Sequence, residues 1–265
     1  MSITIHPTAI VEDGAEIANG VEIGAFSIIG NQVKIGENSK IKSHCVISGK
    51  TTIGKNNQIF QFSSIGEIPQ DKKYNGENTA LIIGDNNVIR ENCTLHLGTI
   101  QDNGVTKIGS NNLLMAYVHI AHDCIVGDNT IFANSAQLAG HAEIGDWAIL
   151  GGYTGVHQFC KVGAHAITGA TSLIVQDVPP FLTVAGNRAK PFGLNVEGLK
   201  RRKFSAENIA HLKQLYKILY KQNLSLEEAK GKIGEILQNE SDPKNKYNTQ
   251  IFLDFLQKSA RGIIR

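Results

Sequence analysis

The sequence has little of what marks several classes of protein. It contains only four cysteines, and none of them is paired at the close spacing of zinc knuckles or redox motifs. Its formal net charge is only +2, which argues against nucleic acid as a partner of the whole molecule. No apolar run approaches the ~18 residues of a membrane span, and residues 1–11 show no cationic start followed by an apolar stretch. We therefore expect a cytoplasmic protein without membrane insertion.

What the sequence does have is an aliphatic residue at every sixth position. Ile, Leu or Val fills nearly all of these positions in three runs, at 5–65, 83–95 and 108–174. A period of six fits neither an amphipathic helix nor an alternating strand. It fits a coil of three short strands and three corners, about 18 residues a turn, whose aliphatic side chains point inwards. The sequence therefore predicts a mainly β solenoid with coils about 4.8 Å apart.

The four cysteines fit this coil as packing residues. Each follows a repeat aliphatic residue by four positions, in the slot that other coils fill with Ala, Ser or Thr; they are Cys45, Cys93, Cys124 and Cys160. A small buried thiol suits such a slot. We expect no redox or metal-binding role for them.

Two polar segments interrupt the repeat. Residues 71–80 and 101–106 each contain an Asn-Gly pair, and the second breaks the six-residue spacing between Leu95 and Ile108. Loops that project from a rigid scaffold commonly carry function, although tolerated insertions are the alternative. We expect both segments to be excursions from the coil.

The repeat stops near Pro179-Pro180, and a helical region follows. Ser205 and Ser225 are placed as N-caps, and Asp242-Pro243 marks a break before a last helix. We expect helices from about residue 190 onward. The chain is accordingly divided into a repeat domain, 1–187, and a C-terminal helical domain, 188–265.

Histidines are the residues most suggestive of chemistry. Three of them, His122, His141 and His157, follow repeat residues that are 18 positions apart and therefore lie on one side of successive coils. We expect these imidazoles, with His119 beside them, to form one wall about 10 Å high. Imidazole titrates near neutrality, so such a wall could exchange protons with a substrate.

The expected chemistry is general-base catalysis. His122 is the candidate base, and Asp123 is the candidate carboxylate that orients it, provided that a corner turns the two side chains together. Gly140 could offer its backbone N–H to an oxyanion. Because no Ser or Cys stands in a nucleophile's context, direct transfer between two bound substrates is expected. The basic run 200–203 would suit phosphates or an acidic partner.

The chain resembles the UDP-N-acetylglucosamine acyltransferase family, which belongs to the hexapeptide-repeat acyltransferases. The resemblance covers nearly the whole chain, and its most specific segments are His119-Ile-Ala-His122-Asp123-Cys124 and Glu197-Gly-Leu-Lys-Arg201-Arg202. Further matching segments are 6–11, 64–67, 110–115, 156–160 and 176–180. The resemblance implies a left-handed parallel β-helix with C-terminal helices, assembled as a homotrimer with active sites in the clefts between subunits.

The activity that the resemblance implies is transfer of an (R)-3-hydroxyacyl chain from acyl carrier protein to the glucosamine 3-hydroxyl of UDP-N-acetylglucosamine. This is the first step of lipid A biosynthesis, and it implies neither cofactor nor metal. His122 would be the base, oriented by Asp123, with Gly140 at the oxyanion. The residues that would line the cleft are Gln70, Asp71, Lys73, His96, His119, His141, His157 and Gln158. Those that would engage the nucleotide and the carrier's pantetheine arm are Asn195, Glu197 and Arg201.

The resemblance also places the limit on acyl-chain length at Ala170 and Ile167. Ala170 stands where long-chain members carry Gly and a short-chain member carries Met. Its methyl group should disfavour the longest chains by about 0.8 kcal/mol for each methylene lost. Leu97 replaces an expected Arg, which puts one charged contact in doubt. The preferred chain length, the details of carrier docking, and the choice between the usual sugar and its 3-amino analogue stay open.

Three other functions stay open as well. A related N-acyltransferase has an extra N-terminal domain, whereas here the repeat begins at Ile5. A trimeric metal-dependent hydratase of the γ-carbonic anhydrase type also has a hexapeptide coil, and three imidazoles would leave one position open on a zinc ion. The spacing His119-x-x-His122 and the helical tail favour the acyltransferase. A binding scaffold without catalysis is the last alternative.

Overall fold

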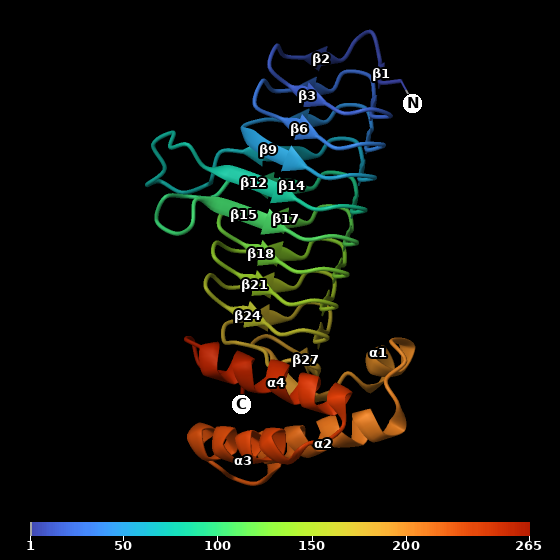
Figure 1. The fold of residues 1–265 in the computed structure, drawn as a ribbon. Coiled ribbons are helices and arrows are strands. Elements are labelled where there is room, and N and C mark those ends of the chain that lie inside the picture. The colour runs from blue at the N-terminus through green and yellow to red at the C-terminus, as the bar shows by residue number, and fades with distance from the viewer. Residues whose placement is uncertain (1) are drawn as a thin grey trace.

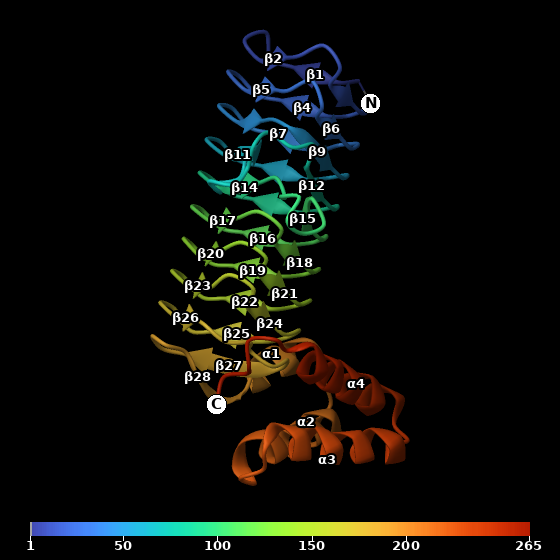
Figure 2. The same ribbon diagram turned by 90° about the vertical axis from the view of Figure 1, so that its left-hand side faces the viewer.

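The computed structural model describes residues 2–265, in which the chain winds as a stack of three-sided coils and ends in a group of helices (Figure 1). Parallel sheets form the three sides, and we call them A, B and C in the order in which the chain enters them. Figure 2 shows the strands of sheet B one above another along one edge of the stack.

Most strands are two residues long, because each corner takes up the rest of the hexapeptide. Among the described residues, sheet A contains β1 (Thr4–Ile5), β4 (Glu22–Ile23), β7 (Lys40–Ile41), β10 (Gln58–Ile59), β13 (Val88–Ile89), β16 (Leu113–Leu114), β19 (Ile131–Phe132), β22 (Ile149–Leu150), β25 (Ile167–Thr168), β27 (Leu182–Ala185) and β28 (Lys190–Leu194). Sheet B contains β2 (Ile10–Val11), β5 (Ile28–Ile29), β8 (Val46–Ile47), β11 (Ser64–Glu67), β14 (Thr94–His96), β17 (His119–Ile120), β20 (Gln137–Leu138), β23 (Gly155–Val156) and β26 (Leu173–Ile174). Sheet C contains β3 (Glu16–Ile17), β6 (Lys34–Ile35), β9 (Lys50–Ile53), β12 (Ala80–Ile83), β15 (Val105–Ile108), β18 (Ile125–Val126), β21 (Glu143–Ile144) and β24 (Lys161–Val162).

The repeat aliphatic residues form the core, as the six-residue period predicts. In sheet A, Ile41 pairs with Ile59 and Ile59 pairs with Ile89, so equivalent side chains stack inside the coil. Ile59 and Ile89 have no exposed surface. Burying such a side chain contributes about 1.5–3 kcal/mol, so the stack is held mainly by its interior.

The cysteines occupy the predicted packing slot. All four are free and buried. The Cys45 sulfur lies 3.1 Å from a carbonyl oxygen of the next coil, in the same position from which the Ser27 hydroxyl donates at 2.8 Å. Burial raises the pKa of Cys45 to about 11 and that of Cys93 to about 12. Thiols of this kind are poor nucleophiles and poor metal ligands at neutral pH.

The two excursions lie where the sequence places them. The first connects β11 to β12 and the second connects β14 to β15, and both project from the same side of the stack (Figure 1). The chain enters each one from sheet B and leaves it into sheet C. Both excursions therefore stand over the corner between sheets B and C.

Four helices follow the coils: α1 (Val196–Arg201), α2 (Ala206–Lys221), α3 (Leu226–Asn239) and α4 (Pro243–Lys258). Ser205 and Ser225 cap α2 and α3 in capping boxes, and Asp242 caps α4, which confirms the predicted helix starts. None of the helices among residues 2–265 has the length and apolarity needed to cross a membrane.

The expectation of helix from about residue 190 is wrong for residues 190–194. They form β28, which pairs antiparallel with β27 and extends sheet A. Pro191 has no N–H to donate, and Gly193 has a φ of 134°, so this segment cannot continue a helix. The proposed boundary between the repeat domain and the helical domain, at residues 187 and 188, falls in the loop between β27 and β28. This boundary stays a proposal.

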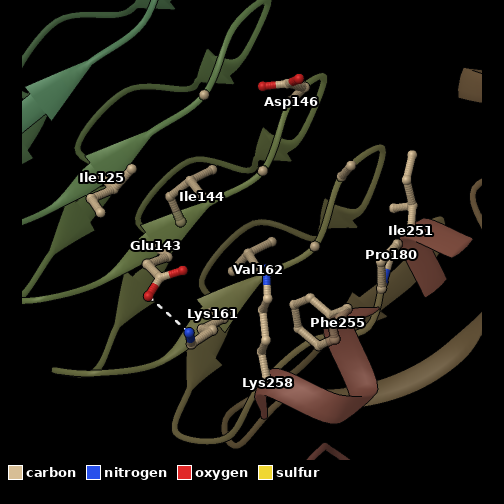
Figure 3. Close-up of a pocket in the computed structure, with 14 residues that line it drawn as sticks. Ile125, Glu143, Ile144, Asp146, Lys161, Val162, Pro180, Ile251, Phe255 and Lys258 are labelled. Carbon is tan, nitrogen blue, oxygen red and sulfur yellow. Dashed lines mark ion pairs between the residues drawn. The ribbon is translucent and has the colours of Figure 1, made fainter. Parts of the chain in front are cut away.

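Helix α4 covers the lower end of sheet C. Phe255 and Ile251 face Val162 across an apolar pocket of about 310 Å³, with the Glu143–Lys161 ion pair at 2.8 Å beside it (Figure 3). None of the expected site residues lines this pocket. The expected site residues lie elsewhere, and several of them are at the corner between sheets B and C, under the excursions.

Candidate active site

The corner between sheets B and C carries two columns of side chains. Because one coil advances the chain by 18 residues here, His122 stands above Gly140 and Gln158. In the next column Asp123 stands above His141 and Phe159, and all three have a left-handed backbone, with φ of 58°, 62° and 64°. The left-handed residue turns the chain sharply, so that neighbouring side chains no longer point to opposite faces.

This turn brings Asp123 to the side chain of His122. The Asp123 Oδ2 atom lies 2.9 Å from His122 Nδ1. The sequence predicts this hydrogen bond only if the corner turns the two side chains together, and the structure shows that it does. A carboxylate can only accept, so His122 donates its Nδ1–H and keeps a lone pair on Nε2. The His122 side chain is 16% exposed and Asp123 is buried. The arrangement presents one basic nitrogen to the outside.

Asp123 is held by the second excursion. The Thr99 backbone N–H donates to Asp123 Oδ1 at 2.8 Å, and the Thr99 hydroxyl donates to Oδ2 at 2.6 Å. The Thr106 hydroxyl accepts from the Asp123 N–H at 2.8 Å. Burial by itself raises the pKa of Asp123, but the hydrogen bonds from His122 and Thr99 outweigh it and hold the pKa below its usual range. The carboxylate therefore stays charged, as an orienting group must.

Gly140 leaves the space that the His122 ring occupies. A Cβ atom on residue 140 would lie 2.5 Å from His122 Cε1 and 2.7 Å from Nε2, so no other amino acid fits against the ring. Gly140 is buried, and none of residues 2–265 accepts a hydrogen bond from its N–H. A free donor beside the basic nitrogen is what an oxyanion site needs.

Replacing Gly140 with alanine is expected to lower kcat by about 10- to 100-fold, because the imidazole must leave its position and a misplaced reacting group costs about that much. Steady-state kinetics with a thermal melt would measure the effect. Gly234→Ala is the matched control, since a Cβ there meets nothing within 4 Å. Unchanged kcat in Gly140→Ala would show that the His122 position is not needed.

A polar groove of about 690 Å³ opens in front of these columns. Several expected residues line it together with His122, namely Gln70, Asp71, Lys73, His141 and Gln158. The first excursion supplies Gln70, Asp71 and Lys73, and the corner supplies the others. The groove thus joins the loop and the corner as the sequence analysis expects.

The histidines do not form a single wall. His122 and His141 are neighbours, with ring centroids 5.1 Å apart, and His96 and His119 form a second pair at 5.0 Å. His157 shares one pocket with His119 and lines another with Arg188 and Arg261, but it does not line the groove in front of His122. The reason is the register: residues two, three and one positions after the repeat aliphatic fall in three different columns, and the corner points each column in its own direction.

The second pair is less accessible than expected. His96 is 3% exposed, its Nδ1 has no partner among the described residues, and it lines neither the His122 groove nor the pocket beside His119. His119 Nδ1 is 2.7 Å from the Thr94 hydroxyl. Burial lowers the pKa of both rings, that of His119 to about 4, so both are neutral at pH 7. Leu97 is buried next to His96, against Gly49.

The residues expected to bind the nucleotide lie apart from the groove. Asn195 is buried, caps α1 through Gly198 N–H, and donates from Nδ2 to the His165 carbonyl at 3.0 Å. Glu197 and Arg201 are exposed on α1. His165 lies at the corner between sheets C and A, so α1 is placed at a different edge of the protomer from His122.

The residues expected to limit chain length also lie elsewhere. Ile167 points outwards from sheet A, and Ala170 is exposed at the corner between sheets A and B. Within one protomer neither of them lines the His122 groove.

The groove contains residues that the sequence did not single out. Gln101, Asp102 and Phe159 line it, and Thr99 holds Asp123 from behind. Three of the four belong to the second excursion. The break in the six-residue spacing between Leu95 and Ile108 was the feature of the sequence that pointed to this segment. Phe159 lies in the matched segment 156–160 beside two expected residues.

The same corner contains three side chains of the types that bind metal ions. His122, Asp123 and His141 offer ligand atoms that lie within 4.8 Å of one another. These are not the three imidazoles that the hydratase alternative needs. The Asp123 carboxylate also accepts three hydrogen bonds already, from His122 and Thr99. The donor set suits an oriented base better than a zinc site.

Comparison with known proteins first defines the class. A model for the bacterial transferase hexapeptide, described as six repeats, matches residues 14–49 and 106–140. A model for domain 2 of the UDP N-acetylglucosamine O-acyltransferase matches residues 177–264. The coils are therefore those of the hexapeptide transferases.

The relatives then define the family. The acyl-[acyl-carrier-protein]–UDP-N-acetylglucosamine O-acyltransferase of Thiobacillus denitrificans is 58% identical over 262 residues, with 99% of each chain covered. That of Herminiimonas arsenicoxydans is 56% identical over 261 residues, covering 98% of this chain and 99% of the relative. The solved structure of LpxA from Acinetobacter baumannii has a TM-score of 0.94 at 50% identity, covering 98% of this chain and 99% of that one. The chain belongs to the UDP-N-acetylglucosamine O-acyltransferase family, and the predicted left-handed parallel β-helix with C-terminal helices is confirmed.

Proposed function

We propose that the protein transfers an (R)-3-hydroxyacyl chain from acyl carrier protein to the 3-hydroxyl of UDP-N-acetylglucosamine, the first step of lipid A biosynthesis, and that it does so in the cytoplasm. The observation that carries the proposal is the His122–Asp123 pair at 2.9 Å, with the free N–H of Gly140 beside it and a polar groove in front. Relatives that cover the whole chain bear the name of this activity.

The transfer needs one base and no covalent intermediate. His122 Nε2 takes the proton of the sugar 3-hydroxyl while the oxygen attacks the thioester carbonyl of the acyl donor. The resulting imidazolium is stabilised by the Asp123 carboxylate, and the Gly140 N–H donates to the negative carbonyl oxygen. When the C–S bond breaks, the carrier thiol leaves with the proton that His122 held. A base contributes about 10²–10⁴ in rate and one oxyanion donor about 10²–10³.

We further propose that the protein works as a homotrimer, and the outer faces of the three sheets support this. Sheet C carries charged side chains, with Glu16–Lys34 and Glu143–Lys161 ion pairs at 2.8 Å. Sheets A and B each carry one run of apolar outward residues, although the first coils of sheet A also bear the Glu22–Lys40 ion pair at 2.8 Å. Their outward residues include Leu113, Ile131, Ile149 and Ile167 on sheet A and Ile10, Ile28 and Val46 on sheet B. The corner between these two sheets exposes Phe26, Phe62, Tyr117 and Tyr153. Apolar surface of this extent marks an interface.

In the proposed trimer, threefold symmetry determines which part of the neighbouring protomer lies beside the His122 groove. In a closed ring each protomer uses two different faces, so sheet A of one protomer packs on sheet B of the next. The corner between sheets A and B then points to the axis. At the outer end of the same interface, the corner that bears His122 meets the neighbour's corner between sheets C and A, where α1 is anchored through His165. Glu197 and Arg201 of the neighbouring protomer thereby reach the groove.

The remaining substrate contacts are proposed from the family resemblance. Gln70, Asp71 and Lys73 would hold the nucleotide sugar from the first excursion, with His141 and Gln158 below them. The neighbour's Asn195, Glu197 and Arg201 would engage the nucleotide and the pantetheine arm. His96, His119 and His157 would line the path of the acyl chain beyond His122, where the neutral ring of His119 meets apolar side chains of sheet B.

The same interface would hold the acyl chain. Ile167 of the neighbour faces sheet B across it, and Ala170 stands at the corner nearest the axis. We propose that the Ala170 methyl group closes the far end of this path and shortens the preferred chain by one or two methylenes, at about 0.8 kcal/mol each.

The test is an acyl-transfer assay with purified carrier loaded with 3-hydroxyacyl chains of increasing length. UDP-N-acetylglucosamine and its 3-amino analogue serve as acceptors, and mass spectrometry identifies the product. The proposal expects an ester on the 3-hydroxyl and a preference that moves to longer chains in Ala170→Gly. No ester with any donor would contradict the proposed function, and amide product alone would favour the N-acyltransferase.

A further inference from the structure

The groove contains a second carboxylate–imidazole pair, which the proposed mechanism does not use. Asp102 Oδ2 lies 3.0 Å from His141 Nδ1, although the two residues are 39 positions apart in the chain. Asp102 belongs to the second excursion, whereas His141 stands at the corner below Asp123. The loop thus contacts the corner at His141 as well as at Asp123, which Thr99 holds.

The His141 ring is fixed on two further sides. It stacks on Phe159 with centroids 4.4 Å apart and an interplanar angle of 11°. It meets the edge of His122 at 5.1 Å and 88°. With these contacts the ring plane is set, and the only freedom left concerns which nitrogen carries the proton.

Asp102 determines which nitrogen of His141 is protonated. His141 Nε2 is 3.9 Å from Asp123 Oδ2, which is too far for a hydrogen bond, so Asp102 is the only carboxylate among the described residues that bonds to the ring. An ionised carboxylate only accepts, and hence Nδ1 is the nitrogen that carries the hydrogen. The other oxygen of Asp102 accepts from the exposed Asn103 side chain at 2.8 Å. His141 lines the groove, and in the neutral ring its Nε2 keeps a free lone pair.

We propose that Asp102 is a positioning residue that locks His141 in the Nδ1–H tautomer and so presents Nε2 as an acceptor for a hydroxyl or N–H group of the acceptor sugar. The inference rests on the proposed function for the identity of that sugar. The two histidines of the groove then have the same polarity: each donates from Nδ1 to a carboxylate and offers Nε2 to the substrate. His122 acts on the reacting hydroxyl, and His141 holds a neighbouring polar group of the same ring.

The tautomer can be measured on the free protein, independently of any activity. Long-range ¹H–¹⁵N correlation spectra of histidine-labelled protein, assigned with His141→Gln, distinguish a protonated Nδ1 from a protonated Nε2. We expect the Nδ1–H form for His141 in the unaltered protein and a shift towards Nε2–H in Asp102→Ala. A predominantly Nε2–H ring in the unaltered protein, or no change in Asp102→Ala, would overturn the proposal whatever the enzyme's substrate.

Kinetics test the consequence for binding. Asp102→Ala is expected to raise KM for UDP-N-acetylglucosamine by about tenfold, the size of one lost hydrogen bond to an oriented group, with kcat changed by less than about threefold. Asp102→Glu should restore part of the loss. Asn103→Ala, in the same loop, should stay within about twofold, because the Asp102–His141 contact remains.

A double-mutant cycle separates positioning from a general effect on the loop. In a His141→Gln background Asp102→Ala should add nothing, since the ring that it positions is gone. An equal KM increase in both backgrounds would overturn the proposal. If the unaltered protein shows no acyl transfer at all, the proposed function fails, while the tautomer measurement still decides the role of Asp102.

Discussion

His122→Ala is expected to lower kcat for acyl transfer by roughly 10²–10⁴, the range for loss of a general base. The KM for UDP-N-acetylglucosamine should change little, because the excursions and the neighbouring α1 make most of the proposed contacts. The melting temperature should also be kept, since the His122 side chain lies at the groove surface and its removal opens no cavity in the core.

Single-turnover kinetics with loaded carrier would measure this effect apart from product release. His6→Ala is the matched control, because His6 is exposed on the first coil and, among residues 2–265, its side chain hydrogen-bonds only to Thr8. A kcat near that of the unaltered protein would remove His122 from the role of base. Loss of binding with kcat intact would assign it to the substrate instead.

Ile149→Asp is expected to separate the trimer and to reduce activity by about 10²-fold or more. Ile149 is half-buried on the outer face of sheet A, between Ile131 and Ile167. A carboxylate placed there would be buried without a partner on assembly, which an interface does not tolerate. In the proposed trimer the neighbour's α1 helps to position the substrates, and loss of positioning costs at least this factor in rate.

Light scattering together with the acyl-transfer assay would report both effects in one preparation. Thr52→Asp serves as the control, because Thr52 points outwards from the charged face of sheet C, beside Lys34. It should leave the trimer and the activity intact. A monomeric Ile149→Asp protein with full activity is incompatible with a site shared between subunits.

The fold could be predicted because its determinants are local and repeated. The same inward position recurs in successive coils, for example at Ile41, Ile59 and Ile89. Each of these residues therefore indicates the register of the next coil. The helix starts could be predicted for a similar reason, since Ser205 and Ser225 bond to residues three positions away. The hairpin of β27 and β28 was not predicted from the sequence, because its pairing depends on contact with the last coil and not on its own residues.

The candidate site could be predicted only in part, because a corner changes side-chain direction with each residue. His122 and Asp123 were found as neighbours in sequence, and the left-handed φ of Asp123 made them neighbours in space. His157 stands one position earlier in its repeat than His122 does, and this difference takes it out of the His122 groove and into a pocket with His119. Asp102 was missed because the path of an excursion is set by the coils that it lies against, and no period in the sequence records it.

Hybrid trimers test most directly the claim that a site is made by the His122 corner of one protomer and α1 of the next. His122→Ala and Arg201→Glu chains, each expected to be nearly inactive alone, would be produced together with different tags and purified as mixed trimers. In every mixed trimer exactly one of the three sites combines an intact His122 with an intact Arg201 from its neighbour, so activity should return to about a third of the normal level. If the mixed trimers stay as inactive as either parent, the two residues serve the same protomer's site and the account is wrong.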